Sequence, residues 1–404
     1  MVTTAAAPLV GVPQAGAAPR LRALDGLRFL AAVGVVLYHY TARWHRAWDE
    51  PPGDRFPVLG QVTSYFALAP ELFFVISGFV ILWTAWGRSV PAVIASRLAR
   101  IFPAYWAALA LTSVLLLAVW RGSKQITWQE VAVNVTLLQE PLGVRHVDGV
   151  YWTLWTELRF YLLIVILVAI GLTRRRVLVF AGTWPVVGLL SDALGWGVLS
   201  AVLVSQYAPL FAGGMLLYLI HRDGHARLPW ALIGVNVVVA LAQVVPAQMR
   251  SLTRNTAFEP SPVLLGVVVV ACFATVAVLA LTRLQHLDWA PMTALGALTY
   301  PLYLVHEFWG WWVIHLVQAR VPTPVALGAA MGFSLALAWL VHHGVEKRLN
   351  PLMRRGIQRT LESRGPWVRR PAAAAPPAVR PQQPVRRPAP RPTGRTALGP
   401  LRTG

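Results

Sequence analysis

Apolar runs long enough to cross a lipid bilayer recur along this chain, and they constrain its fold more than any other feature of the sequence. A membrane-spanning helix needs about 20 mostly apolar residues to cross a hydrocarbon core of about 30 Å. The composition agrees, because 56% of the residues are hydrophobic and 13% are charged, whereas a typical soluble domain has about 25% charged residues. The sequence therefore predicts an all-α, polytopic membrane protein.

The apolar runs predict about ten transmembrane helices in one bundle. We expect these helices at residues 24–41, 62–86, 102–120, 151–171, 177–192, 198–220, 229–246, 262–282, 292–316 and 325–343. Cytoplasmic loops of membrane proteins are enriched in Lys and Arg. Arg97, Arg100 and residues 174–176 lie in connections on the same side as the N-terminus, so we expect both termini to be cytoplasmic.

The chain is expected to have three parts. Residues 1–19 are rich in Ala, Pro and Gly and are expected to be disordered, and residues 20–352 form the membrane domain. Residues 353–404 form a basic cytoplasmic tail rich in Pro and Arg. We expect this tail to be largely disordered, because Pro removes backbone donors and no apolar face remains to be buried.

The net charge of +20 would suggest nucleic-acid binding in a soluble protein. Here the excess comes from the basic flanks of the apolar runs and from the tail, so we expect membrane lipid rather than nucleic acid as the partner. The single cysteine, Cys272, cannot form an intrachain disulfide. The His and acidic residues lack the spacing of metal ligands, and no metal site is expected.

Ionisable side chains inside the expected membrane helices are costly, so each one needs a partner or a function. In the first helix, Arg28 and His39 are eleven positions apart. This spacing places them within about 20° of the same face and about 16 Å apart along the axis, with Asp25 near that face. In an alternative interpretation, Arg28 extends to the inner surface and His39 lies among the outer headgroups.

Two carboxylates also lie at membrane depth in the expected helices. Glu71 lies near the middle of the second helix and must pair, hydrogen-bond or be protonated, whereas Ser77 and the glycine after it are expected to permit close helix packing. Glu157 lies about 9 Å below the outer end of the fourth helix, at a depth similar to that of His39. A carboxylate beside a histidine suits a general base, although Glu157 could pair with Arg159 instead.

Arg97 and Arg100 are three positions apart and adjacent if that segment is helical. Two neighbouring guanidinium groups can bind a phosphate, but they can also simply set the membrane topology. In the ninth expected helix, Pro301 predicts a kink beside Tyr303 and His306.

Taken together, five motifs resemble those of the acyltransferase-3 family of integral membrane O-acyltransferases, over most of residues 20–352. They are Leu24–Arg28 followed by His39, Glu71–Phe79, Arg97–Trp106, Trp152–Tyr161 and Leu295–His306. Each motif is weak alone, but five in the right order and spacing form a specific signal. Two positions depart from the family pattern: Glu71, where Asp is usual, and Trp155, where a smaller residue is more usual.

The resemblance implies an enzyme that moves an acyl group, expected to be acetyl, from acyl-coenzyme A to a hydroxyl of a carbohydrate or lipid-linked sugar. His39 is then the expected general base, Glu157 its partner, and Arg28, Arg97 and Arg100 the expected donor contacts. The expected pocket residues are Asp25, Glu71, Ser77, Tyr161, Tyr303 and His306. No permanently bound cofactor is expected, and the expected location is the plasma membrane, here a bacterial inner membrane.

Two other functions remain open for the same set of buried polar residues. One is a transporter or flippase of lipid-linked or acylated molecules that performs no acyl transfer, although we find no internal repeat of the kind that many transporters contain. The other is a structural partner in an envelope-assembly complex that has lost catalysis. The presence of both His39 and Glu157 argues against the second function.

Overall fold

The computed structural model describes residues 21–364, and the first predicted segment and most of the predicted tail lie outside this range. The described chain is helical, and its only β feature is an isolated bridge between Arg43 and Thr256. The α-helices are α1 (Arg22–Thr41), α2 (Pro52–Arg55), α3 (Leu59–Thr63), α4 (Ala69–Ala85), α5 (Val90–Val114), α6 (Trp128–Val135), α7 (Trp152–Ala169), α8 (Arg174–Ala193), α9 (Gly197–Leu203), α10 (Ala208–Asp223), α11 (Arg227–Asn255), α12 (Pro262–Leu281), α13 (Ala290–Val317), α14 (Thr323–Val341) and α15 (Lys347–Arg364). Short 3-10 and π segments join several of them: η1 (Arg46–Trp48), η2 (Ser64–Leu68), η3 (Leu115–Val119), η4 (Gly149–Tyr151), η5 (Arg283–His286) and η6 (His342–Glu346).

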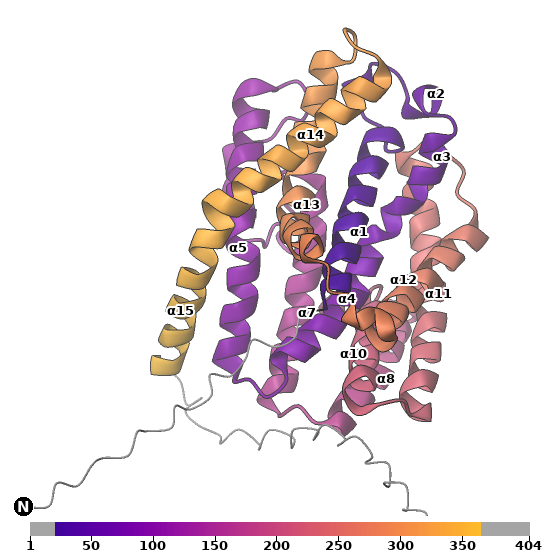
Figure 1. Cartoon of the computed structure of the whole chain (residues 1–404), viewed down its shortest axis with the longest axis vertical. Coiled ribbons are helices and arrows are strands. Elements are labelled where there is room, and N and C mark those ends of the chain that lie inside the picture. Colours follow the sequence, from indigo (N-terminus) through magenta and orange to yellow (C-terminus); the bar gives the residue numbers. More distant parts are fainter. Residues whose placement is uncertain (1–20, 365–404) are drawn as a thin grey trace, which may run out of the picture. The chain divides into compact units, whose positions relative to one another are not determined.

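Eight helical stretches within residues 21–364 are long and apolar enough to cross a membrane. Helices α1 and α13, which we also expected to span, are not among them, because their ionisable and aromatic side chains lower the mean hydropathy. These two helices pack extensively against each other (Figure 1). This packing keeps their polar side chains away from lipid, where they would be costly.

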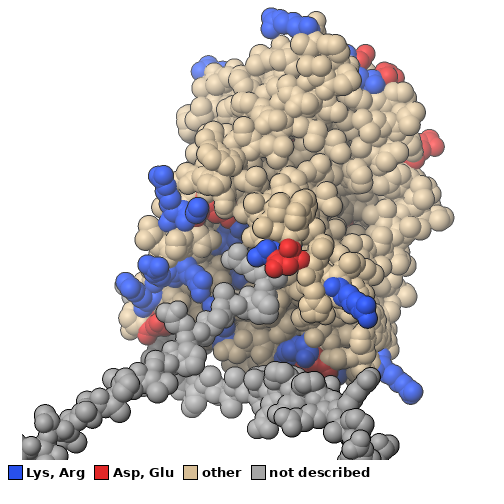
Figure 2. Space-filling model, in the orientation of Figure 1, with Lys and Arg blue, Asp and Glu red and all other residues tan. Residues whose placement is uncertain are grey.

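The apolar surface of the bundle is that of a protein surrounded by lipid. Val198 and Val263 are 83% and 72% exposed, and large exposed apolar patches in a folded chain mark membrane or partner contacts. Figure 2 shows a broad uncharged zone between charged residues at the two ends of the visible face. The all-α membrane architecture predicted from the sequence is therefore confirmed.

Helices α4 and α10 approach so closely that glycine is required on both. A Cβ atom added at Gly78 would lie 2.0 Å from the Phe211 carbonyl oxygen, and one added at Gly214 would lie 2.0 Å from that of Val75. Small residues allow such backbone contact between membrane helices. The close packing expected at residues 77–78 is confirmed, and it makes α10 the buried centre of this side of the bundle, since 83% of its apolar stretch is buried.

The last helices form one continuous helical run from α14 through η6 to α15, which descends beside α5 in Figure 1. The run extends to Arg364, so the first residues of the tail predicted at 353–404 are helical rather than disordered. The π segment η6 interrupts the α pattern near the middle of the run. Insertions of this type are often found at functional sites, and this one carries Glu346.

Candidate active site

Two adjoining cavities lie inside the bundle. The larger, which we call the arginine cavity, has a volume of about 870 Å³, and the residues that line it include Asp25, Arg28, Ser77, Arg97, Arg100, Glu157 and Tyr161. The smaller, which we call the histidine cavity, has a volume of about 150 Å³, and the residues that line it include Tyr38, His39, Arg43, Gln248 and Glu307. Pro70 and Tyr303 line both cavities and form part of the wall between them.

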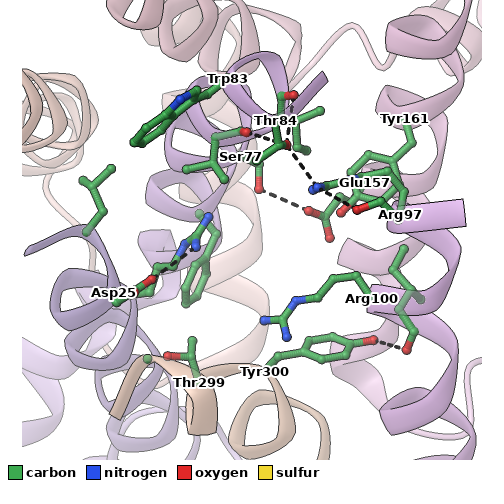
Figure 3. Close-up of a pocket in the computed structure, with 18 of the residues that line it drawn as sticks. Asp25, Ser77, Trp83, Thr84, Arg97, Arg100, Glu157, Tyr161, Thr299 and Tyr300 are labelled. Carbon is green, nitrogen blue, oxygen red and sulfur yellow. Dashed lines mark hydrogen bonds and ion pairs between the residues drawn. The ribbon is translucent and has the colours of Figure 1, made fainter. Parts of the chain in front are cut away.

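Six helices, α1, α4, α5, α7, α13 and α15, bring the polar side chains of the arginine cavity together. Figure 3 shows them facing one another: Asp25 on α1, Ser77 on α4, Arg97 on α5, Glu157 on α7 and Tyr300 on α13. These residues are far apart in the sequence, so the cavity exists only when the bundle has assembled. It gathers seven of the eleven residues predicted for the site, with Tyr303 in its wall as the eighth.

Two of the three predicted donor-binding arginines have a carboxylate partner. Arg28 Nη1 lies 3.7 Å from Asp25 Oδ1, one turn earlier on α1. Arg100 forms an ion pair with Glu346 of η6, and its guanidinium lies 5.2 Å from the centre of the Tyr300 ring. Each of these two cations is therefore at least partly neutralised before any ligand binds.

Arg97 is placed differently. Its Nη2 donates to Thr84 Oγ1 at 3.0 Å, and its guanidinium lies 5.7 Å from the centre of the Tyr161 ring. No aspartate or glutamate in residues 21–364 forms an ion pair with it. Its positive charge is available to a ligand in the arginine cavity.

The sequence predicts that Glu157 pairs with His39, but in the structure the two side chains do not pair. Its carboxylate accepts a hydrogen bond from Ser77 Oγ at 3.1 Å and bonds to the hydroxyl of Tyr161. Glu157 lines the arginine cavity and His39 the histidine cavity. The reason is helix packing, because α1 packs chiefly against α13, which places His306 next to His39.

The partner of His39 within the described chain is His306. His39 Nδ1 lies 3.1 Å from His306 Nε2 and 2.9 Å from the Val35 carbonyl oxygen. His306 Nδ1 in turn lies 2.8 Å from the Tyr303 carbonyl oxygen. Trp311 Nε1 donates to the backbone oxygen of His39 at 2.9 Å and fixes this end of α1 against α13.

These contacts determine which ring nitrogens carry protons. A carbonyl oxygen only accepts hydrogen bonds, so Nδ1 carries the proton in both neutral rings. His306 Nε2 is then an acceptor for the N–H of His39. The remaining nitrogen, His39 Nε2, makes no hydrogen bond within residues 21–364 and keeps its lone pair. A histidine held in this tautomer can accept a proton from a hydroxyl group.

A pair of carboxyl groups lies beside the two histidines. The Asp148 side chain forms a hydrogen bond with that of Glu307, and Glu307 Oε1 lies 3.9 Å from Arg43 Nε. Asp148 Oδ2 and Glu307 Oε2 are buried and accept no hydrogen bond from a donor group in the described chain. Burial and the nearby Glu307 carboxylate raise the pKa of Asp148 well above its usual range. A proton held between the two groups would satisfy both oxygens and leave a single negative charge facing Arg43.

Two predicted pocket residues line neither cavity. His306 is fully buried behind His39, and Glu71 is fully buried on α4. Glu71 Oε1 accepts a hydrogen bond from Gln248 Nε2 at 2.7 Å, and Gln248 lines the histidine cavity. Both residues therefore orient a cavity side chain rather than form the cavity surface.

Sequence reasoning did not assign a role to Asp148, Glu307, Glu346 or Gln248. Glu307 had a signal, since it is an acid beside His306 in an apolar run. Asp148 lies in a polar loop and Gln248 near the end of α11, where polar residues are common and carry no signal. Glu346 comes after the last predicted span, and only the π segment turns it towards Arg100.

No cluster in residues 21–364 has the three or more His, Cys, Asp or Glu side chains that could hold a metal ion. Cys272 is buried in α12 and free.

A family profile described as an acyltransferase domain, that of the acyltransferase-3 family, matches residues 21–343. The chain belongs to the acyltransferase-3 family. This confirms the resemblance read from the five motifs. Among curated relatives, an acyltransferase of Streptomyces mycarofaciens, MdmB, is 28% identical over 150 residues, which are 35% of this chain and 38% of that protein. No solved structure matches the chain.

Proposed function

We propose that this protein is a membrane O-acyltransferase that uses the arginine cavity for an acyl-coenzyme A donor and the histidine cavity for a hydroxyl acceptor. The family supports acyl transfer, and the arrangement of the cavities supports two separate substrates. One observation carries the proposal most: His39 is held in the tautomer that leaves Nε2 free, in the wall of a polar cavity next to a larger one.

The proposed reaction consists of a proton transfer to His39, an acyl transfer, and a second proton transfer from His39. His39 Nε2 takes the proton of the acceptor hydroxyl, and the oxygen attacks the carbonyl carbon of the thioester. The tetrahedral intermediate then expels the thiolate, which takes the proton back from His39 and leaves as coenzyme A. During the proton transfer, the hydrogen bond from His39 Nδ1 to His306 holds the His39 ring in place. The negative charge of the Asp148–Glu307 pair favours the positively charged form that His39 adopts for a moment.

The proposed topology has the donor entering from the cytoplasm. The basic connections that predict cytoplasmic loops border the arginine cavity, which contains Arg97 and Arg100. His39 is about 16 Å further along α1 than Arg28, so an extended pantetheine arm would cross this distance.

We further propose a carbohydrate or lipid-linked sugar as the acceptor, acetyl as the acyl group and a bacterial inner membrane as the location. The size and polar lining of the histidine cavity suit one sugar ring.

The decisive test uses inverted membrane vesicles, which expose the cytoplasmic face, and labelled acetyl-coenzyme A. The native protein should move label into glycan or lipid, or release free thiol. His39→Ala should lower the rate by about 10²- to 10⁴-fold, the usual contribution of a general base. His306→Ala should lower kcat and alter its pH profile, because His39 loses the acceptor for its N–H. Exposed His225 provides the control, and His225→Ala should retain native activity.

Two outcomes would contradict parts of this proposal. If His39→Ala turns over as fast as the native protein, His39 is not the base. If the native protein uses neither acetyl nor longer-chain nor succinyl donors, a transporter or flippase of lipid-linked or acylated molecules becomes the better explanation of the two cavities.

A further inference from the structure

Three arginines that lie near one another in the wall of the arginine cavity form no ion pair with an acidic residue of the described chain. They are Arg88 in the connection between α4 and α5, Arg97 on α5 and Arg354 on α15, and all three line the cavity. No Asp or Glu of residues 21–364 forms an ion pair with any of them. This distinguishes them from Arg28 and Arg100, which have Asp25 and Glu346.

The three charges are close enough to repel one another. The pKa of Arg88 is lowered by burial and then by the positive charges of Arg354 and Arg97. Unpaired cations that face one another are unfavourable without a counter-ion. Their gathering at a cavity is therefore better explained by an anionic ligand than by stability.

The number and type of these side chains indicate a ligand with several phosphate groups. A guanidinium group binds phosphate oxygens with two parallel hydrogen bonds, and three such groups exceed what one carboxylate would require. Trp83 lines the same cavity and is drawn in Figure 3, and its half-buried indole offers a face on which a purine can stack.

We propose that Arg88, Arg97 and Arg354 bind the phosphate groups of a nucleotide-bearing thioester, so that this protein selects coenzyme A thioesters over pantetheine thioesters. The inference rests on the proposed function, because it identifies which part of the donor lies beside these three arginines. Only Arg97 belongs to the sequence motif that suggested donor binding. Arg88, in the loop after α4, and Arg354, on α15, reach the same cavity from other parts of the chain. Anionic lipid headgroups have the same phosphate chemistry, and the experiment must separate the two sources.

The test measures binding first, so that it does not depend on turnover. Full-length protein in lipid nanodiscs is titrated with coenzyme A, 3′-dephospho-coenzyme A and pantetheine. For the native protein, affinity should fall in that order. Arg88→Ala and Arg354→Ala should each weaken coenzyme A binding by about tenfold, as expected for one charge-assisted contact, and should leave pantetheine binding unchanged. Arg355→Ala is the matched control, because Arg355 is the exposed neighbour of Arg354 and does not line the cavity.

Turnover and lipid composition complete the test. With acetyl-coenzyme A, both variants should raise KM at unchanged kcat, whereas acetyl-pantetheine should show no difference. Equal losses for all donors would overturn the phosphate site while leaving acyl transfer intact. Coenzyme A binding that depends on Arg354 without any turnover would support the site and contradict the proposed function. If the variants differ from native only in nanodiscs that contain phosphatidylglycerol, the arginines bind lipid headgroups and the nucleotide proposal is wrong.

Discussion

At the scale of single residues, we expect a proton shared between Asp148 and Glu307 to make the stability of the folded protein depend on pH. The folded protein favours the neutral form of Asp148, because burial and Glu307 raise its pKa. A carboxyl group whose pKa is higher in the folded than in the unfolded state contributes stability that is fully present below its unfolded pKa, about 3.9. This contribution is lost as the pH rises through the folded pKa.

We therefore expect Asp148→Asn to retain its fold and to lose this pH dependence. An amide resembles the protonated acid in shape and can still donate to Glu307. The measurement is Tm in detergent between pH 5 and pH 9, where the native protein should lose more stability than the variant. Asp54→Asn, at an exposed position, should behave like the native protein. A native-like pH dependence in Asp148→Asn would show that the shared proton is not at this residue.

Sequence reasoning at this scale predicted His39 as the general base, which stays a prediction, and expected Glu157 beside it, where the structure places His306. Arg28 and His39 could be recognised because charged groups in an apolar run stand out. The choice between Glu157 and His306 as the neighbour of His39 required knowledge of which helix packs against α1, and the sequence does not contain that information in any local pattern.

At the scale of helices, the contact between α4 and α10 depends on glycine. A methyl group at Gly214 would meet the backbone at 2.0 Å from Val75 O and 2.8 Å from Phe79 N, and backbone atoms cannot move aside as a side chain can. Gly214→Ala should therefore lower the free energy of unfolding by about 1–3 kcal/mol or more, the usual cost of overpacking. Since α4 carries Ser77, activity should fall with it.

The measurement is thermal unfolding of the purified protein, and α11 offers the control. A Cβ atom at Gly234 would meet nothing within 4 Å. Gly234→Ala should be neutral or slightly stabilising, because alanine favours a helix over glycine by up to about 1 kcal/mol. Equal Tm values for the two variants would mean that the helices separate easily and that the close contact is not required.

Most helices were predictable, because apolar runs and basic flanks define them directly. The ends of the helices were less predictable than their presence. The predicted last span stopped at residue 343, but the helical run continues through η6 and α15, whose sequence is polar on one side and leaves no apolar run to recognise. Glu346 and Arg354 were missed for this reason.

At the scale of the whole molecule, the proposed orientation can be tested with the chain's own cysteine content. Cys272 is the single cysteine, so Cys272→Ser gives a background without reactive thiols. Gly122→Cys and Gly356→Cys then introduce single probes, and neither added side chain would meet another atom within 4 Å.

With both termini cytoplasmic, an impermeant maleimide added to intact cells should label the Gly122→Cys protein and spare the Gly356→Cys protein. Inverted vesicles should give the opposite result. Labelling of both positions from one side would contradict an arrangement in which α5 crosses the membrane, and a reversed pattern would contradict the proposed orientation.

The wall between the two cavities has a consequence for the permeability of the membrane. The Tyr303 hydroxyl donates to the Val150 carbonyl oxygen at 3.1 Å and accepts from Thr153 Oγ1 at 3.0 Å, so the ring is fixed across the boundary. Under the proposed function, neither substrate needs to pass this ring as a whole molecule, because a few atoms of acyl group are all that change sides. The free energy of the thioester would then drive transfer of the acyl group across the boundary and its esterification in one event, without an ion gradient.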